Sequence, residues 1–470
     1  MYKKKVLVFI DNDVIVRYFI ANDTFKELED NYEIKYVFNQ DPGRFDFKTN
    51  EIVLKKISNE KMIFTYIPRK RIGRWFLLYI INVFRQQRRA LRKNGSRQHY
   101  LALLEHETNQ IGKRNVFLAK IAGLPIFYQL ITLFFKKKLG IHKDIIQTIN
   151  NEKPDILIHP CFLSGYFINE LFRASKKFNI PFLILVNSWD NCCSKAFCTG
   201  KPDKLVVWGE QARRHAKQYL GLKDNRIECF GSAQFEIYKT PPQNNRKELA
   251  EFFNVDPHKR IILYAGVSAS ANETSYLKLL DNAITESTLP NCQVIYRPHP
   301  WRGGLVENEQ DFHSLNWKNV VIDPTMEEFY KSIIRNPNRK MFLADYSISN
   351  KLLTLADGVI SPLSTMLIES LLKGKPVLAF FPEKGEKEVL RLEFIHFSEF
   401  IKIKEANSCF TEIEFIPSCK KLISQIGDES IAKILKKKSE YFIANKKETY
   451  GYQLAQLCDQ INISQKKTLS

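Results

Sequence analysis

The stretch from Leu355 to Phe381 (LADGVISPLSTMLIESLLKGKPVLAFF) constrains the fold of this chain more than any other part of its sequence. Asp357 to Ile360 have the character of a short buried strand, and Met366 to Lys373 carry apolar residues at helical spacing. Gly374 ends that helix, and the apolar residues after it predict a second buried strand. A strand, a helix and a strand in this order indicate the βαβ unit of an α/β protein.

The turn between the first strand and the helix has the composition of an anion-binding site. Ser361, Ser364 and Thr365 supply hydroxyl groups beside a helix N-terminus, where backbone N–H groups lack intrahelical partners and attract phosphate. Glu369 lies one turn beyond Thr365 on the same helix face, where its carboxylate would accept hydrogen bonds from ribose hydroxyls. The alternative is an ordinary helix cap with Glu369 in solvent, and the local sequence leaves both interpretations open.

Strands and helices alternate over most of the chain, which predicts an α/β fold class. Apolar runs predict further strands at Lys5–Ile10, Tyr32–Asn39, Pro154–His159, Ile180–Val186, Lys204–Trp208, Ile227–Phe230, Arg260–Ala265, Gln293–Arg297 and Asn319–Ile322. Periodic apolar residues predict helices at Val14–Leu28, Tyr166–Phe178, Gln211–Leu220, Ser275–Ser287 and Ile348–Ala356.

The length of 470 residues predicts two domains or more. The polar, proline-rich segment KTPPQNN at 239–245 is the best candidate for a linker. We therefore predict an N-terminal Rossmann-like domain over 1–238 and a linker over 239–245. A C-terminal Rossmann-like domain would follow over 246–425, with further helices and a tail over 426–470.

Acidic residues follow two predicted strands of the first domain. Asp11 and Asp13 come directly after Lys5–Ile10, and Asp190 lies in the polar loop after Ile180–Val186. Ligands of doubly wound sheets bind outside the carboxyl ends of strands, so these three carboxylates are candidates for catalysis. The alternatives are a helix cap or turn for the first two, and a turn packed on Trp189 for the loop. No glycine-rich dinucleotide motif follows the first strand, which argues against a nicotinamide enzyme.

Two strand ends of the predicted second domain carry candidate ligand-binding residues. Two prolines flank His299 and hold its backbone extended, and Arg297 and Arg302 lie beside it, a set that suits a phosphate. A capped structural histidine is the alternative. Gly266 begins a loop of small residues after Arg260–Ala265, which would let a ligand approach the backbone closely.

The net charge of +20 indicates attraction to nucleic acid, to an anionic membrane or to phosphorylated substrates. Residues Lys61 to Leu104 include eleven Lys or Arg and no Asp or Glu, and they contain the apolar run Trp75 to Phe84. A second apolar stretch, Val116 to Phe135, has basic flanks and polar interruptions that disfavour a membrane span. We interpret both stretches as helices on an anionic membrane face. Internal helices with a solvated basic face are the alternative.

The cysteine pattern indicates reduced thiols rather than a disulfide framework. Cys192, Cys193 and Cys198 cluster among nine scattered cysteines, but no paired C-x-x-C set accompanies them. A zinc site with His215 is the alternative for this cluster. The N-terminus MYKKKVLVFIDND lacks a secretory signal. We therefore expect a cytoplasmic protein that is peripherally associated with the inner face of the cell membrane.

The R-P-H-P turn of Arg297 to Pro300 and the S-x-x-S-T…E…G-K-P element of Ser361 to Pro376 resemble motifs of two-domain glycosyltransferases of the GT-B type. Within that group the sequence looks most like the CDP-glycerol glycerophosphotransferase-like and surface-polysaccharide transferases of bacteria. Bacterial sialyltransferases of this fold also pair a His-Pro motif with a Ser-Ser/Thr motif. The resemblance implies two Rossmann-like domains that face a central cleft.

The same resemblance implies roles for residues of this chain. His299, Ser364 and Thr365 would hold the phosphates of a nucleotide-activated donor, linked to CMP, CDP or UDP, and Glu369 would hold its ribose. No E-x7-E motif surrounds Glu369, which favours an inverting mechanism.

The base in this family is usually a carboxylate or histidine of the first domain, so its candidates are Asp11, Asp13 and Asp190. The expected acceptor is lipid-linked or a glycan, at an anionic membrane surface, in the synthesis of bacterial surface polysaccharide. We expect no metal, no further cofactor and no nucleic-acid partner.

Three other functions stay open. A non-hydrolysing sugar-nucleotide 2-epimerase shares the expected fold, although no convincing His-Glu pair lies near the strand ends of the first domain. A nucleic-acid-binding protein would use the positive charge, but the arginines lie beside an aliphatic patch without a recognised module. A non-catalytic scaffold would keep the fold alone.

Overall fold

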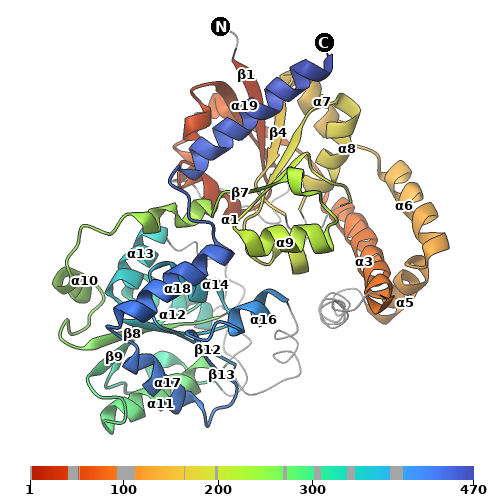
Figure 1. Ribbon diagram of the computed structural model, residues 1–470. Helices are drawn as coiled ribbons and strands as arrows, with labels where there is room; N and C mark the ends of the chain where they lie inside the picture. The colour runs from red at the N-terminus through yellow and green to blue at the C-terminus, as the bar shows by residue number, and fades with distance from the viewer. Residues whose placement is uncertain are drawn as a thin grey trace. The chain divides into compact units, whose positions relative to one another are not determined.

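The computed structural model describes residues 3–40, 51, 53–92, 112–162, 165–195, 199–267, 272–300, 309–335, 345–381 and 395–469. The chain forms two compact units, each built on one parallel sheet (Figure 1). The first unit comprises Met1–Gln234, Leu390–His396 and Phe442–Ser470, and the second comprises Phe235–Val389 and Phe397–Tyr441. The first division lies just before the predicted linker. The C-terminal residues, predicted as a segment of their own, are divided between the two units.

In the described part of the first unit, seven parallel strands form the sheet, in the order β3-β2-β1-β4-β5-β6-β7. The direction of the strand order reverses between β1 and β4, and ligands of doubly wound sheets bind at such a point. Val6 to Ile10 are at most 1% exposed, which suits the central position of β1. The strands are β1 Lys4–Ile10, β2 Tyr32–Asn39, β3 Met62–Thr65, β4 Ile156–His159, β5 Phe182–Leu185, β6 Lys204–Val207 and β7 Ile227–Cys229.

Helices from both ends of the chain pack on this sheet. The C-terminal helix α19 lies beside β1 (Figure 1), and its Leu454 and Leu457 share a buried apolar cluster with Val6 and Val8. The helices of this unit are α1 Asp13–Ile15, α3 Arg69–Arg92, α5 Gly112–Ala122, α6 Pro125–Leu139, α7 Lys143–Glu152, α8 Ile168–Phe178, α9 Glu210–Tyr219 and α19 Tyr450–Leu469. Single turns of other kinds are the π-helices η1 Val16–Ile20 and η4 Asn191–Lys195, and the 3₁₀-helices η2 Lys26–Leu28, η3 Asn59–Lys61 and η5 Asp224–Arg226.

The second unit has a sheet of six parallel strands among its described residues, in the order β10-β9-β8-β11-β12-β13. Its core is rich in aromatic rings, among them Tyr264, Tyr296 and Phe380. The strands are β8 Arg260–Ala265, β9 Cys292–Arg297, β10 Val320–Ile322, β11 Gly358–Pro362, β12 Val377–Phe380 and β13 Asn407–Cys409. The helices are α10 Arg246–Phe252, α11 Glu273–Thr285, α12 Pro324–Arg335, α13 Tyr346–Leu355, α14 Thr365–Leu372, α16 Ile395–Ile401, α17 Phe415–Ser424 and α18 Glu429–Phe442, with the 3₁₀-helices η6 Ala233–Lys239 and η7 Phe312–Ser314.

The predicted strands are confirmed, and β2 and β8 span the predicted residues. The single helix predicted over Val14–Leu28 is wrong, because the chain forms α1, η1 and η2 there instead. Asn22 Nδ2 donates to Tyr18 O (2.9 Å), and Asp23 adopts a φ of 52°, so a continuous helix ends before these residues.

Among the residues that the structure describes, no helix combines the length and the apolarity that crossing a bilayer requires. Within the same ranges, no group of three or more His, Cys, Asp or Glu is placed to hold a metal ion. Cys198, Arg302 and the small-residue loop at 268–271 lie outside the described residues.

Candidate functional site

Among the residues that the structure describes, no side chain caps the helix N-terminus that follows the turn between β11 and α14. The buried Ser361 hydroxyl donates to Ala265 O (2.8 Å) and lies 2.8 Å from Ser364 Oγ. Because a hydroxyl has one proton, Ser364 is the donor in the second hydrogen bond. Ser364 occupies the N-cap position of α14, yet its side chain makes no capping hydrogen bond. The first N–H groups of α14 therefore keep the capacity to bind an anion.

The carboxyl ends of β9, β8 and β11 lie next to one another in the second sheet. Gly266 N donates to Arg297 O (2.9 Å), and Ser361 reaches the carbonyl of the residue before Gly266. Ser364 and Thr365 are partly exposed at the same edge. The structure thus brings these five predicted site residues to one edge of one sheet.

Arg297 presents a buried guanidinium with unused hydrogen-bonding capacity. Its side chain ends 3.5 Å from the carboxylate of Asp323, and only 6% of the residue is exposed. Arg297 Nη1 and Asp323 Oδ2 have no hydrogen-bond partner among the described residues. The other Asp323 oxygen accepts from Thr325 N (2.9 Å) and Oγ1 (2.7 Å). Arg297 Nη1 and Asp323 Oδ2 are the atoms that lie 3.5 Å apart, so Nη1 is ion-paired with Asp323 but makes no hydrogen bond to a described residue that a phosphate oxygen would first have to break.

His299 lies two residues beyond the end of β9 and is partly exposed, whereas Pro298 before it is buried. The histidine therefore follows Arg297 at the carboxyl edge of the second sheet, as predicted. The residues after Pro300 up to 308 lie outside the described residues.

Glu369 is buried in α14 and accepts a hydrogen bond from the hydroxyl of Tyr238 in η6. Burial, with the negative charge of Glu369, raises the pKa of Tyr238 well above its ordinary value, so the phenol keeps its proton and donates. Lys373 Nζ donates to Tyr238 O (3.0 Å). Burial, with repulsion from Lys375 and Lys436, lowers the pKa of Lys373 to about 8. Glu369 is thus a buried group in a polar network, and the alternative of a solvated residue is wrong.

Packing within the second unit explains why residue 266 is a glycine. A Cβ at this position would lie 2.6 Å from Glu273 Oε2. The fully buried Glu273 carboxylate accepts from Val267 N (2.6 Å) and from the Tyr296 hydroxyl (2.6 Å), so it cannot move aside without losing both.

The N-terminus of α11 is already occupied by a carboxylate. Glu309 Oε1 accepts from Glu273 N (3.2 Å), Thr274 N (3.3 Å) and Thr274 Oγ1 (3.2 Å). Asn272 caps the same helix through Ser275 N. Of these two helix N-termini, that of α14 is therefore the better place for a phosphate.

In the first unit, Asp11 is tied into a buried network at the carboxyl ends of β1 and β4. Its Oδ2 lies 2.6 Å from His159 Nε2, and its Oδ1 accepts from Tyr166 N (2.8 Å). His159 Nδ1 faces Cys161 O at 2.6 Å. Both carboxylate oxygens of Asp11 thus have partners, which suits a residue that supports the strand ends.

Asp13 and Asp190 differ in their surroundings. Asp13 is the first residue of α1 and is 9% exposed, and Asn12 rather than an aspartate caps the helix through Ile15 N (3.3 Å). Asp190 is 6% exposed, in a loop closed by Asn191 Oδ1, which accepts from the backbone N–H groups of Asn187 (3.1 Å) and Ser188 (3.0 Å).

The loop that carries Asp190 packs on Trp189, as its alternative interpretation predicts. The indole is 3% exposed and contacts the rings of His396 (5.1 Å between centroids) and Phe442 (6.0 Å). A π-helical turn, η4, follows this loop, and another, η1, follows β1. π-Helical turns are rare in proteins, and those that occur are often found at functional sites.

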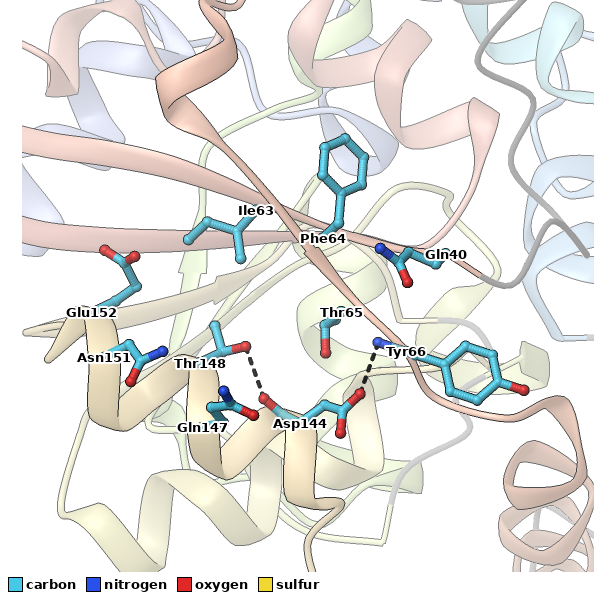
Figure 2. Close-up of a pocket in the computed structure, with 10 residues that line it drawn as sticks. All are labelled: Gln40, Ile63, Phe64, Thr65, Tyr66, Asp144, Gln147, Thr148, Asn151 and Glu152. Carbon is cyan, nitrogen blue, oxygen red and sulfur yellow. Dashed lines mark hydrogen bonds between the residues drawn. The ribbon is translucent and has the colours of Figure 1, made fainter.

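A hollow of about 220 Å³ lies between β3 and α7 of the first unit (Figure 2). Thr65 Oγ1 is buried there without a hydrogen-bond partner among the described residues. None of the predicted site residues lines this hollow, which is bordered by Gln40, Ile63, Phe64, Thr65, Tyr66, Asp144, Gln147, Thr148, Asn151 and Glu152.

No protein-family model and no curated protein matches the sequence. Solved structures do match. A putative UDP-N-acetylglucosamine 2-epimerase from Listeria monocytogenes has a TM-score of 0.50 at 13% identity, over 100% of this chain and 97% of that chain. UGT89C1 of Arabidopsis thaliana, complexed with UDP, has a TM-score of 0.50 at 12% identity, over 97% of this chain and 99% of that chain. The protein has a GT-B fold. The predicted α/β class with two Rossmann-like domains is confirmed.

Within this GT-B fold, the residues predicted for the donor belong to the second unit, and those predicted for the base belong to the first. Sequence reasoning missed their buried partners His159, Tyr238 and Asp323, and it also missed Glu309 at the N-terminus of α11. His159 ends β4 and Asp323 directly follows β10, so position at a strand end was the available signal for these two. Tyr238 and Glu309 do not lie at the end of a described strand, so the sequence offered no comparable signal for them.

Proposed function

We propose that the protein transfers a sugar or polyol group from a nucleotide-activated donor to an acceptor hydroxyl. The observation that carries this proposal is the N-terminus of α14, which no side chain of the described residues caps and which lies at the same sheet edge as the Arg297 guanidinium. Partly exposed Ser364 and Thr365 add hydroxyl groups there. Positive charge and N–H donors stabilise the charge that develops on a leaving nucleotide phosphate.

The donor-site residues take distinct roles in this proposal. Arg297, His299, Ser364 and Thr365 hold the phosphates together with the first N–H groups of α14. Glu369, held in place by Tyr238, accepts hydrogen bonds from the ribose. This set needs no metal or further cofactor.

The base is a carboxylate of the first unit, and Asp13 is our choice among the three candidates. It lies three residues beyond the end of β1, at the point where the strand order of the sheet reverses. Asp11 instead supports the strand end through His159. Asp190 is the second choice, because β5 lies one strand further from that point. A single base that takes the proton of the acceptor hydroxyl corresponds to an inverting mechanism.

The acceptor in this proposal is lipid-linked or a glycan, at an anionic membrane surface, in the synthesis of bacterial surface polysaccharide. UDP is the first donor nucleotide to test, since UGT89C1 was solved with UDP and shares the fold. The resemblance to glycerophosphotransferase-like enzymes makes CDP and CMP the next.

Thermal unfolding with CMP, CDP, UDP, GDP and ADP tests the donor site. We expect one nucleotide to raise the Tm of the wild type, and the double variant Ser364→Ala/Thr365→Ala to lose most of this shift. Ser430→Ala is the matched control, because its hydroxyl also lies at the start of a helix of the second unit, where it bonds Asp428 (2.6 Å). A shift by no nucleotide, or an equal shift in both variants, would contradict the proposal.

An acceptor-free assay separates transfer from epimerisation. The proposed transferase leaves the sugar of UDP-N-acetylglucosamine unchanged when no acceptor is present. Accumulation of an epimerised sugar nucleotide under these conditions would establish the 2-epimerase instead. Salt-sensitive binding of plain oligonucleotides, without any nucleotide shift, would support the nucleic-acid alternative.

A further inference from the structure

The two apolar stretches that the sequence places at a membrane differ in burial. Trp75, Ile80 and Phe84 on α3 are at most 2% exposed. The prediction that Trp75 to Phe84 contacts a membrane is therefore wrong, because the interior of the first unit already covers these side chains. The reason is tertiary packing, since α5 and α6 both pack against α3.

The hairpin of α5 and α6, residues 112–139, instead exposes apolar side chains along both helices and the turn between them. Ile126 is 77% exposed, which is far from the burial expected of an isoleucine in a helix that packs in a core. An exposed set of this size marks an interaction site. Its members are Phe117, Leu118, Ile121, Leu124, Ile126, Phe127, Leu130, Leu133 and Phe134.

The charge of the hairpin has one sign. The sequence from 112 to 139 contains six Lys or Arg and no Asp or Glu. Lys120, Lys137 and Lys138 are exposed among the apolar side chains. Apolar side chains interleaved with basic ones are complementary to an anionic lipid surface.

The hairpin is fixed to α3 by specific contacts. Tyr128 OH donates to Asn82 Oδ1 (3.1 Å), and the Arg85 guanidinium lies 4.2 Å from the centre of the Tyr128 ring. Gly123 lies in the turn between α5 and α6. A Cβ atom at this position would lie only 3.2 Å from Phe84 Cβ, so the glycine lets the turn approach α3 closely.

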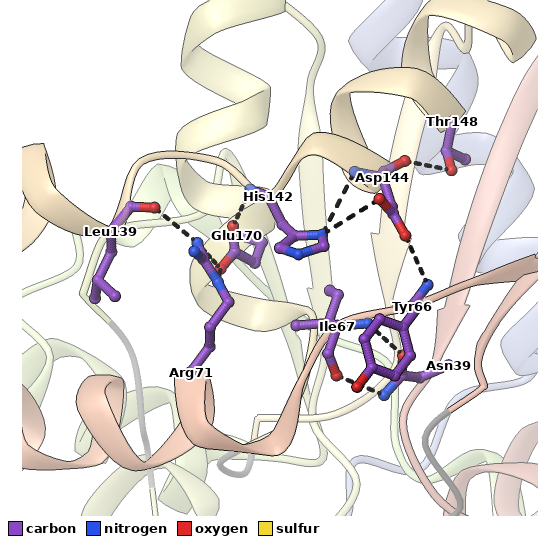
Figure 3. Close-up of polar contacts among 9 residues, drawn as sticks. All are labelled: Asn39, Tyr66, Ile67, Arg71, Leu139, His142, Asp144, Thr148 and Glu170. Carbon is purple, nitrogen blue, oxygen red and sulfur yellow. Dashed lines mark hydrogen bonds and ion pairs between the residues drawn. The ribbon is translucent and has the colours of Figure 1, made fainter.

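A buried carboxylate secures the base of the hairpin (Figure 3). Glu170 on α8 is fully buried and accepts from Arg71 Nε (2.8 Å), Arg71 Nη2 (2.6 Å) and His142 N (2.8 Å). Arg71 Nη2 also donates to Leu139 O (2.9 Å) at the end of α6. The exposed apolar face therefore belongs to an element that is held at both its turn and its base.

We propose that the α5–α6 hairpin inserts its apolar face into the interface of an anionic bilayer, with its lysines at the lipid headgroups. A helix that crosses a bilayer needs about 20 residues, and α6 has 15, so the hairpin lies in the interface. This inference deepens the proposed function, because it names the surface at which a lipid-linked acceptor would reach the protein.

Sedimentation of the full-length chain with vesicles tests the inference. We expect binding to phosphatidylcholine vesicles that contain phosphatidylglycerol and little binding to phosphatidylcholine alone. Leu133→Asp/Phe134→Asp should reduce the partition coefficient roughly tenfold or more, because both side chains are exposed and would carry charge into the apolar layer. Lys137→Glu/Lys138→Glu should reduce it as well, through repulsion from the anionic lipid. Ile413→Asp is the matched control, since Ile413 is 89% exposed in the second unit.

Wild-type protein that fails to bind anionic vesicles, or a Leu133→Asp/Phe134→Asp variant that binds as tightly as wild type, would overturn the inference. A wild-type dimer in solution that this variant dissociates would also overturn it, since a second copy would then cover the face. Circular dichroism and the nucleotide-induced Tm shift establish that each variant is folded. Vesicle binding without any nucleotide binding would contradict the proposed function alone, and the reverse result would contradict this inference alone.

Discussion

Asp11 and His159 form a buried hydrogen bond that joins the carboxyl ends of β1 and β4, with 2.6 Å between Asp11 Oδ2 and His159 Nε2. The other ring nitrogen faces Cys161 O, which only accepts hydrogen bonds, so Nδ1 carries a proton. A hydrogen bond at Nε2 then requires a second proton, on the imidazole or on Asp11. The pair therefore shares a buried proton at the point where the strand order of the first sheet reverses.

Two substitutions of Asp11 should differ strongly in their effect on stability. Asp11→Ala leaves the buried His159 without its partner, and we expect a loss of about 3–5 kcal/mol in the free energy of unfolding. Asp11→Asn should lose far less, because the amide can donate to a neutral Nε2 and still accept from Tyr166 N. Urea denaturation of both variants measures the difference. Equal losses would contradict a structural role for this hydrogen bond.

Ser361 and Ser364 should separate stability from nucleotide binding. Ser361→Ala removes a buried hydrogen bond between β11 and β8, at a cost of about 1–2 kcal/mol in unfolding free energy. Ser364→Ala should cost less, roughly 0.5 kcal/mol, because its side chain is partly exposed, caps no backbone group and gives up only the hydrogen bond to Ser361 Oγ. Its nucleotide-induced Tm shift should fall nonetheless. If Ser364→Ala were the less stable of the two variants, the arrangement of this turn would need revision.

Tyr238→Phe should weaken both the second unit and its donor site. The substitution takes a hydrogen-bond donor away from the buried Glu369 carboxylate, which costs about 1–3 kcal/mol. Tyr346→Phe is the matched control, because that ring packs against Tyr238 within the same unit. Chemical denaturation gives the stability, and calorimetric titration gives the affinity for the nucleotide that stabilises the wild type. A Tyr238→Phe variant that matches the control in both would remove Glu369 from the proposed ribose site.

The strand pattern of this chain could be predicted because both sheets are parallel and buried. Runs such as Val6 to Ile10 are apolar without interruption, which makes their position visible in the sequence. Two short strands at the sheet edges, β3 with four residues and β13 with three, were not predicted, because runs this short are not distinctive in the sequence. The two π-helical turns were not predicted either, since no residue pattern marks them.

The site was predictable in part, because the strand ends locate candidate ligand-binding residues but not their partners. Tyr238 lies 131 residues from Glu369 in sequence, and His159 lies 148 residues from Asp11. Such pairs arise only from the tertiary fold. Burial in the basic region also depends on the tertiary fold, because the apolar side chains between Trp75 and Phe84 of α3 are mostly buried and those of the α5–α6 hairpin are mostly exposed.

Lys373 should make the stability of the protein depend on pH above neutrality. Burial lowers its pKa to about 8, from 10.5 in the unfolded chain. Between these pH values Lys373 is protonated in the unfolded state and largely deprotonated in the folded state. The contribution of Lys373 to the free energy of unfolding therefore rises with pH from about 8 to about 10.5. Other groups titrate in this range, and the difference between wild type and Lys373→Met isolates the lysine. We expect the variant to have the shallower rise in urea denaturation series at pH 7.5, 8.5 and 9.5, with the exposed Lys438→Met as control. Parallel pH profiles for wild type and Lys373→Met would mean that the ammonium group is solvated in the folded protein.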